Sequence, residues 1–273
     1  DFDIFQTVGS KDFSIIKYTL GVNKKNIIGY KNFYLFNENL NFSFPDISNV
    51  DASFFPFTID YVAKNIENKS RAGWIYAQLA KIYFPYLQTN SENVLVVDSD
   101  VFFTKHTKFF DSSNKPFFTT SDEFHEPYFL HMLRVHPDFK RVSKKSGISH
   151  HMLFNKELVG SMIKKVEEHH QKKFFDVYLE QIDGKENSPS ADYEIYFHYV
   201  VKNYKTNYSI RELRWKNVSK LTQQEYSSFE MLSLPHYSGT RPSDILKNLK
   251  KRKIIRFVKS IQNFIFLKTR IKV

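Results

Sequence analysis

The residues best suited to chemistry in this sequence are Asp98 and Asp100, which only Ser99 separates. They directly follow residues 94–97, a short Val-rich run that predicts a strand buried on both faces of a parallel sheet. In open α/β sheets, ligands bind beyond the carboxyl ends of the strands. Two carboxylates there suit a divalent cation, Mn²⁺ or Mg²⁺, which would in turn hold phosphate oxygens. The alternative is an ordinary strand-to-loop turn, in which Asp and Ser are common.

The elements that would position this pair begin with a βαβ unit at the start of the chain. Residues 3–8 predict a first strand, residues 13–23 show helical spacing of apolar side chains, and residues 31–36 predict a second strand. The loop after the first strand would face the same edge of the sheet as the two carboxylates, so Thr7 is a candidate ligand-binding residue. A simple connection is the alternative for this loop. Residues 37–57, rich in Asn, Ser and Pro, predict a long irregular connection.

A helix is predicted over residues 71–84, with Ser70 as its N-cap and Pro85 at its end. Arg71 falls in the first turn, where the helix dipole disfavours a cation. We therefore expect Arg71 to have an anionic partner, and a phosphate shared with Asp98 and Asp100 is one candidate. A solvated or carboxylate-paired arginine is the alternative.

Two adjacent histidines open another predicted strand, residues 149–155, which leads into a helix at residues 156–171. Successive strand side chains point to opposite faces, so one of His150 and His151 could line a cleft while the other stays in the core or in solvent. We assign acceptor binding to His151. A purely structural role is the alternative for a single strand histidine.

Asp192 and Glu194 lie in the first turn of a further predicted helix that follows Ser190. Acids at a helix N-terminus are favoured by the dipole, which is sufficient to explain them structurally. They are also the best candidates for a general base if the reaction requires one.

The composition bounds the class of protein. The chain has 273 residues with 41% hydrophobic and 25% charged residues, typical of a globular α/β protein. The absence of cysteine excludes disulfides and cysteine-ligated zinc and favours a reducing, cytoplasmic location. The sequence contains no apolar run of about 18 residues that could span a membrane.

The net charge of +11 is concentrated at the C-terminus. Residues 244–273 contain ten Lys or Arg and one Asp, whereas residues 1–243 are nearly neutral, which argues against a nucleic-acid groove across the body. We therefore expect a catalytic domain over 1–243 and a separate tail. The tail predicts a basic amphipathic helix in contact with the inner face of an anionic membrane; packing against the body is the alternative. Its apolar face would comprise Ile254, Phe257, Val258, Ile261 and Ile265.

In this order of elements, the chain resembles nucleotide-sugar glycosyltransferases of the GT-A fold. The resemblance implies a Rossmann-like, mixed and mostly parallel sheet flanked by helices, with an Asp-x-Asp after a central strand. It is sharpest to a bacterial and viral family of predicted glycosyltransferases still labelled a domain of unknown function, over roughly residues 1–240. The segments that carry this likeness are Arg71-Ala72-Gly73-Trp74, residues 94–100, residues 149–155 and Asp192-Tyr193-Glu194-Ile195-Tyr196.

A weaker resemblance is to glycogenin-type retaining transferases, which carry a late His-aromatic-x-Gly followed by a basic residue and Pro. Here the corresponding segment begins at His236 and includes Arg241 and Pro242. The spacing from Gly239 to the basic residue is one residue shorter than that pattern, Arg replaces Lys, and no Trp follows the Pro. The likeness implies a metal site of Asp98, Asp100 and His236.

These resemblances imply transfer of a sugar from a nucleoside diphosphate, most simply UDP, to a saccharide or lipid-linked saccharide in surface glycan synthesis. The metal would stabilise the departing diphosphate, and an inverting reaction would need Asp192 or Glu194 as base, whereas a retaining one would not. The stereochemistry stays open. The donor-binding residues would be Thr7, Arg71, Asp98, Ser99 and Arg241.

Two rival functions remain. Phosphohydrolases of the haloacid-dehalogenase type also use Asp-x-Asp after a strand, but they require Thr or Val where this chain has Phe102, and usually place the motif on the first strand. A non-enzymatic module that binds membranes or nucleic acid is supported only by the basic tail.

Overall fold

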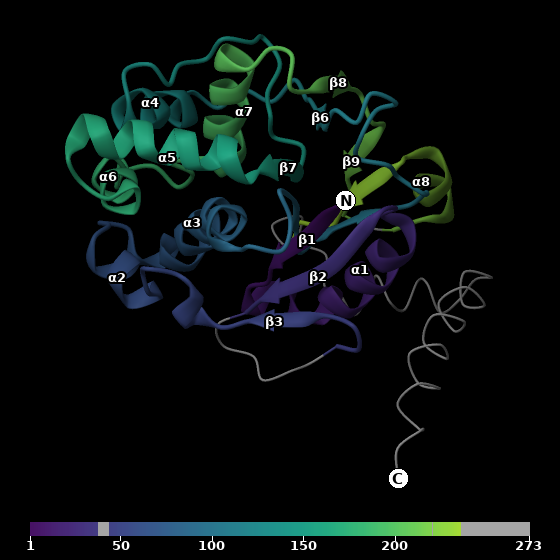
Figure 1. The fold of residues 1–273 in the computed structure, drawn as a ribbon. Helices are drawn as coiled ribbons and strands as arrows, with labels where there is room; N and C mark the ends of the chain where they lie inside the picture. The colour runs from purple at the N-terminus through teal and green to yellow at the C-terminus, as the bar shows by residue number, and fades with distance from the viewer. Residues whose placement is uncertain (38–43, 220, 236–273) are drawn as a thin grey trace.

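The computed structural model describes residues 1–37, 44–219 and 221–235. Its centre is a five-stranded sheet with the order β3-β2-β1-β4-β7, in which the first four strands are parallel and β7 is antiparallel to β4 (Figure 1). The predicted fold class, a mixed and mostly parallel sheet flanked by helices, is confirmed for this part of the chain. The strands are β1 (Phe2–Thr7), β2 (Tyr30–Phe36), β3 (Ser48–Val50), β4 (Asn93–Asp98) and β7 (His151–Asn155).

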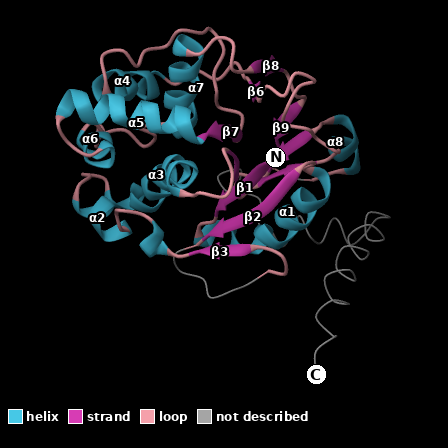
Figure 2. Cartoon of the chain, in the orientation of Figure 1, coloured by secondary structure: helices cyan, strands magenta, loops and turns pink. Residues whose placement is uncertain are grey.

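Helices cover both faces of this sheet (Figure 2). Side chains alternate along β4, so Val94 and Val96 pack on the face covered by α3, α5, α6 and α7, while Leu95 and Val97 pack with α1. All four are fully buried, as the sequence predicts. The helices are α1 (Phe13–Asn26), α2 (Ile59–Lys64), α3 (Ala72–Leu87), α4 (Glu126–Val135), α5 (Lys156–His170), α6 (Phe174–Glu180), α7 (Asp192–Asn203) and α8 (Gln223–Ser228).

Two small sheets complete the described fold. Residues 209–217 form two short strands with different partners: β8 pairs with β6, and β9 pairs with β10. The order β5-β10-β9 brings the end of the described chain beside the residues that follow β4. These strands are β5 (Val101–Phe103), β6 (Phe117–Thr119), β8 (Ser209–Arg211), β9 (Trp215–Asn217) and β10 (Met231–Ser233).

The start and end of α3 differ from the prediction. Ser70 is not the N-cap, because it lies in a short 3₁₀ turn and its hydroxyl donates to Asn68 Oδ1 at 2.6 Å; Arg71 takes the cap position without a side-chain bond. Pro85 lies inside the last turn and α3 continues to Leu87. A proline near a helix end removes only one backbone hydrogen bond, which the buried helix tolerates here.

The connection at residues 37–57 also contains more structure than predicted, namely β3 and the 3₁₀ turn Ala52–Phe54.

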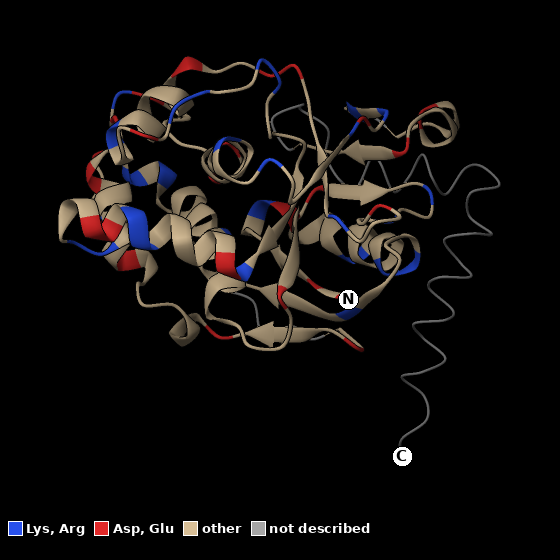
Figure 3. Cartoon of the chain, turned by 45° about the horizontal axis from the view of Figure 1, so that its top comes forward, with Lys and Arg blue, Asp and Glu red and all other residues tan. Residues whose placement is uncertain are grey.

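Positive and negative side chains are interspersed over the described helices (Figure 3), in agreement with the nearly neutral body. Within the described ranges, no helix is both long and apolar enough to cross a membrane. The predicted tail helix, His236 and Arg241 lie outside the described residues.

Candidate functional site

The carboxyl ends of β1 and β4 meet at one edge of the central sheet. Thr7 pairs with Asp98 in the parallel register, and both residues end their strands. Because β7 is antiparallel, it starts at this same edge, with His151 opposite Val97. The topology therefore brings Thr7, Asp98 and the histidine pair together, as expected for a ligand site in an open α/β sheet.

Asp98 is the most heavily bonded carboxylate of the site. Its Oδ1 accepts hydrogen bonds from Lys81 Nζ at 2.9 Å and from the Tyr193 hydroxyl at 2.8 Å, and its Oδ2 lies 3.3 Å from His150 Nδ1. Burial alone would raise the pKa of Asp98, but the Lys81 ammonium and the His150 ring outweigh it and hold that pKa well below its usual range. Asp98 is therefore ionised.

Lys81 joins two carboxylates that are distant in sequence. This side chain on α3 is 7% exposed, and its Nζ lies 2.9 Å from both Asp98 Oδ1 and Asp192 Oδ2. Burial lowers the pKa of Lys81, yet the two carboxylates more than reverse this and raise it. Lys81 was not predicted as a site residue from the sequence. Its only signal is a lysine within the apolar stretch of α3, between Ala80 and Ile82.

Asp192 and Glu194 both lie in the first turn of α7, as predicted, but in different surroundings. Asp192 is buried at the site, where burial raises its pKa and Lys81 opposes that rise. Glu194 accepts from Ser146 Oγ at 2.5 Å and from the Gly147 backbone N–H at 3.1 Å, and its Oε2 lies 3.2 Å from Nε2 of a histidine of the next turn, His198. Glu194 thus belongs to a separate, fully engaged network.

Asp100 lies at the turn from β4 into β5. The Ser233 hydroxyl donates to its Oδ2 at 3.2 Å, and the Leu234 backbone N–H donates to its carbonyl at 2.9 Å. Burial and the neighbouring Asp98 charge raise the pKa of Asp100 to about 6. Two adjacent carboxylates, one ionised and one with a raised pKa, form a site that a cation would stabilise.

Ser99 and Thr7 contribute little polar surface to this edge. The Ser99 hydroxyl donates to Asp12 Oδ2 at 2.6 Å, and its carbonyl accepts from Thr19 Oγ1 at 2.8 Å. Both bonds tie Ser99 to the α1 side of the sheet, and Ser99 and Thr7 are both buried. Their assignment as donor-binding residues stays a prediction.

The two histidines exchange the roles expected from the sequence. His151 is 3% exposed, with its ring between Phe103 and Phe109 and its Nε2 3.0 Å from Thr119 Oγ1. This burial does not agree with the acceptor contact assigned to His151. His150 instead reaches Asp98, from a backbone with φ +60° just before β7 begins.

Arg71 is not brought to Asp98. Ten residues of helix separate it from Lys81, which corresponds to about 15 Å of rise between the two backbone positions, and its assignment to donor binding stays a prediction. Its guanidinium lies 4.2 Å from the centre of the Trp74 ring, and burial lowers its pKa. Among the described residues, no carboxylate forms an ion pair with Arg71, and its buried Nε has no hydrogen-bond partner.

A metal ion would find an incomplete set of protein ligands at this edge. Within the part of the chain that the structure describes, no three His, Cys, Asp or Glu side chains are arranged to hold a metal. Asp98 and Asp100 alone fit the way Mg²⁺ is commonly bound, through one or two carboxylates with substrate phosphates completing the shell. The pair thus suits a cation that arrives with a phosphorylated ligand. The predicted third ligand, His236, is outside the described residues.

Comparison with known proteins gives only a distant likeness. No family model matches the chain. No curated protein matches its sequence. Among solved structures, the chain is similar to mouse xyloside xylosyltransferase 1 in its apo form, with 9% identity and a TM-score of 0.44, over 85% of this chain and 97% of that one. This likeness is too low for an activity or a residue role to be transferred.

Proposed function

We propose that this protein is a metal-dependent glycosyltransferase that moves a sugar from a nucleoside-diphosphate sugar, UDP-linked, to a saccharide or lipid-linked saccharide. The observation that carries the proposal is the carboxylate pair at the end of the central strand, with Asp98 tied to Asp192 through the buried Lys81. Asp98 and Asp192 thus lie beside the Lys81 ammonium, at the edge where ligands bind in open α/β sheets.

The donor would be held through its diphosphate. Asp98 and Asp100 would hold Mn²⁺ or Mg²⁺, which supplies Lewis-acid stabilisation of the negative charge on the departing diphosphate. Asp98 is already ionised, and the pKa of Asp100 near 6 leaves it largely ionised at neutral pH. Tyr193 and His150 fix the orientation of Asp98 without any contribution from the ligand.

During transfer, a bond forms between the acceptor oxygen and the anomeric carbon while the bond from that carbon to the diphosphate oxygen breaks. The acceptor proton must leave. In an inverting reaction Asp192 is the better of the two predicted bases, because Glu194 is fully engaged by Ser146, Gly147 and His198. A retaining reaction would leave Asp192 and Lys81 as positioning residues only.

The rival enzyme class gains no support. The motif follows β4 rather than the first strand, and Phe102, two residues after Asp100, is fully buried where the dehalogenase-type enzymes carry a small Thr or Val.

As an extension of the same proposal, we place the acceptor at the inner face of a membrane, which residues 244–273 would contact. This extension depends on the basic composition of residues 244–273.

The proposal is tested by exposing the full chain to a panel of nucleotide sugars. We expect one donor to raise the melting temperature and to be hydrolysed only when Mn²⁺ or Mg²⁺ is present. Asp100→Asn should abolish both effects, whereas the matched control Asp183→Asn, on an exposed loop, should retain them. Equal hydrolysis with and without excess chelator would contradict metal dependence.

A further inference from the structure

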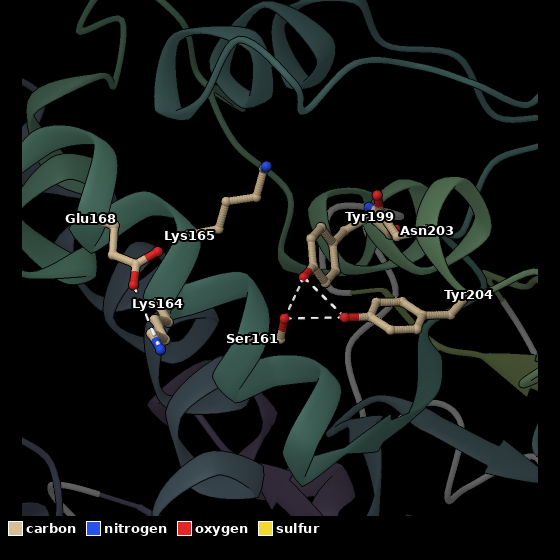
Figure 4. A pocket seen from close by; sticks show the side chains of 7 residues that line it. All are labelled: Ser161, Lys164, Lys165, Glu168, Tyr199, Asn203 and Tyr204. Atoms are coloured by element: carbon tan, nitrogen blue, oxygen red, sulfur yellow. Dashed lines mark hydrogen bonds and ion pairs between the residues drawn. The ribbon is translucent and has the colours of Figure 1, made fainter.

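A hollow of about 400 Å³ lies between α5 and the end of α7 (Figure 4). Volumes of this order are common for small-molecule sites. Its walls are almost entirely polar side chains, and none of them belongs to the site around Asp98. The lining residues are Ser161, Lys164, Lys165, Glu168, Tyr199, Asn203 and Tyr204.

The topology places this hollow far from the carboxylate pair. Asn155 pairs with Asn93 at the start of β4, whereas Asp98 ends that strand. The five residues of strand between them correspond to about 16 Å, and α5 begins only after Asn155. Along α7, the path from Asp192 to Asn203 independently gives a similar separation of about 16 Å. A ligand in the hollow is therefore not at the reacting centre.

The inner wall carries three hydroxyl groups that meet at one point. Ser161 Oγ lies 2.7 Å from the Tyr199 hydroxyl and 3.1 Å from the Tyr204 hydroxyl, and the two phenolic oxygens are 3.5 Å apart. Burial raises the pKa of Tyr199 to about 12, so the phenol keeps its proton at neutral pH. Each hydroxyl can donate and accept, and the cluster can re-form its bonds around a ligand that does the same.

The outer wall carries both signs of charge. Lys164 and Glu168 form a 3.6 Å pair with side chains 75% and 66% exposed, and such pairs contribute little stability and exchange partners readily (Figure 4). Lys165 is held by Asp138 at 2.9 Å. Because both lysines of this wall lie beside a carboxylate, the wall does not select an anion, and its polar side chains do not select an apolar ligand.

We propose that this hollow is an accessory binding site for a neutral saccharide. A sugar offers several hydroxyls that donate and accept, which the Ser161, Tyr199 and Tyr204 hydroxyls and the Lys164–Glu168 pair can satisfy together. The identification of that saccharide with a distant segment of the acceptor or product glycan rests on the proposed function. Holding that segment raises the effective concentration of the reacting end at the catalytic site.

The site is tested by ligand-observed saturation-transfer NMR on the full chain with maltotriose, chitotriose and xylotriose. At least one should bind in the millimolar range. The double variant Ser161→Ala/Tyr204→Phe, which removes two of the three hydroxyls, should raise its dissociation constant at least fivefold. Tyr61→Phe, which removes a phenolic hydroxyl elsewhere on the surface, should leave binding unchanged. A second double variant, Lys164→Ala/Glu168→Ala, changes only exposed side chains and should also weaken binding. It tests the site even if the first double variant fails to fold.

Several outcomes would overturn the site. These are no binding of any of the three sugars, binding as tight as that of the wild type by both double variants, or loss of binding in Asp100→Asn instead, which would put the sugar beside the carboxylate pair. Binding that is lost in the double variants of a protein that processes no nucleotide sugar would uphold this site while the proposed function fails. The two inferences are thus separable.

Discussion

Asp192 and Glu194 begin the same helix two residues apart, yet they belong to opposite kinds of carboxylate network. Asp192 shares one cation, Lys81, with Asp98 at an edge of the sheet where ligands bind. Glu194 has both oxygens occupied by neighbouring groups within the core. The difference teaches that two acids with one sequence signal, favoured alike by the helix dipole, can enter separate hydrogen-bonding networks. The two acids differ in their partners: Asp192 shares the Lys81 ammonium with another carboxylate, whereas both oxygens of Glu194 have hydrogen-bond partners of their own.

The strongest way to break this comparison is to remove the shared cation. Lys81→Met would remove the cation that Asp98 and Asp192 share and leave the His150 ring as the positive neighbour of Asp98. We expect a loss of about 3–5 kcal/mol in the free energy of unfolding, the usual cost of breaking a buried pair. Urea unfolding at pH 7 measures it, and adding Asp192→Asn should recover part of the loss.

A matched control for that experiment is Lys164→Met, which removes an exposed lysine from a weak pair. Its effect should be below about 1 kcal/mol. A Lys81→Met protein as stable as this control would show that the two carboxylates do not depend on the lysine.

The next effect is on turnover. Asp100→Asn keeps the shape of the side chain but removes the charge that would hold a divalent cation. We expect a loss of about 10²-fold or more in the rate of transfer, measured with the donor identified in the nucleotide-sugar panel. Near-normal turnover of this variant would show that Asp100 does not hold a metal that the reaction requires.

The elements around Asp98 were predictable because burial on both faces of β4 leaves a direct trace in the sequence, four apolar residues ending at a carboxylate. The histidine assignment was not. The alternation of side chains holds only within a strand, and β7 starts at His151, so His150 adopts a left-handed backbone that no alternation describes. That conformation turns its ring toward Asp98.

Lys81 was beyond reach for a different reason. Its partners lie 17 and 111 positions away in sequence, and only the packing of α3 against the central sheet and α7 brings them together. A lysine in an apolar stretch indicates a buried charge, but the sequence alone does not say which carboxylates pair with it. Local patterns thus specified the sheet and the Asp-x-Asp, whereas long-range contacts decided which acid of α7 is joined to Asp98.

The comparison sharpens further with Glu194→Gln. This change keeps the volume but weakens the bonds to Ser146 and His198, and we expect a loss of about 1–3 kcal/mol in stability with near-normal turnover. Asp192→Asn should do the reverse if Asp192 is the base of an inverting reaction. Equal loss of turnover in both variants would mean that Glu194 also acts at the reacting centre. Full turnover in both would favour a retaining reaction, which the anomeric configuration of the product determines independently.

The smallest effect is a pH dependence of stability that originates at Asp100. Burial and Asp98 raise its pKa from 3.8 to about 6, so folding favours the protonated form. The stability that Asp100 contributes is therefore fully present below about pH 4 and is lost as the pH rises through about 6. Between pH 5 and pH 7 this corresponds to about 1 kcal/mol, since one pKa unit is about 1.4 kcal/mol.

The pKa of His150 is also raised, and that of Asp192 likewise, so the whole chain has other contributions of the same sign. The difference between wild type and Asp100→Asn isolates the Asp100 contribution. Urea unfolding of both proteins in chelator at pH 5 and pH 7 should show the wild type losing about 1 kcal/mol more than the variant. If the free energy of unfolding changes by the same amount in both proteins, Asp100 has an ordinary pKa. The attraction of the carboxylate pair for a cation would then come from Asp98 alone.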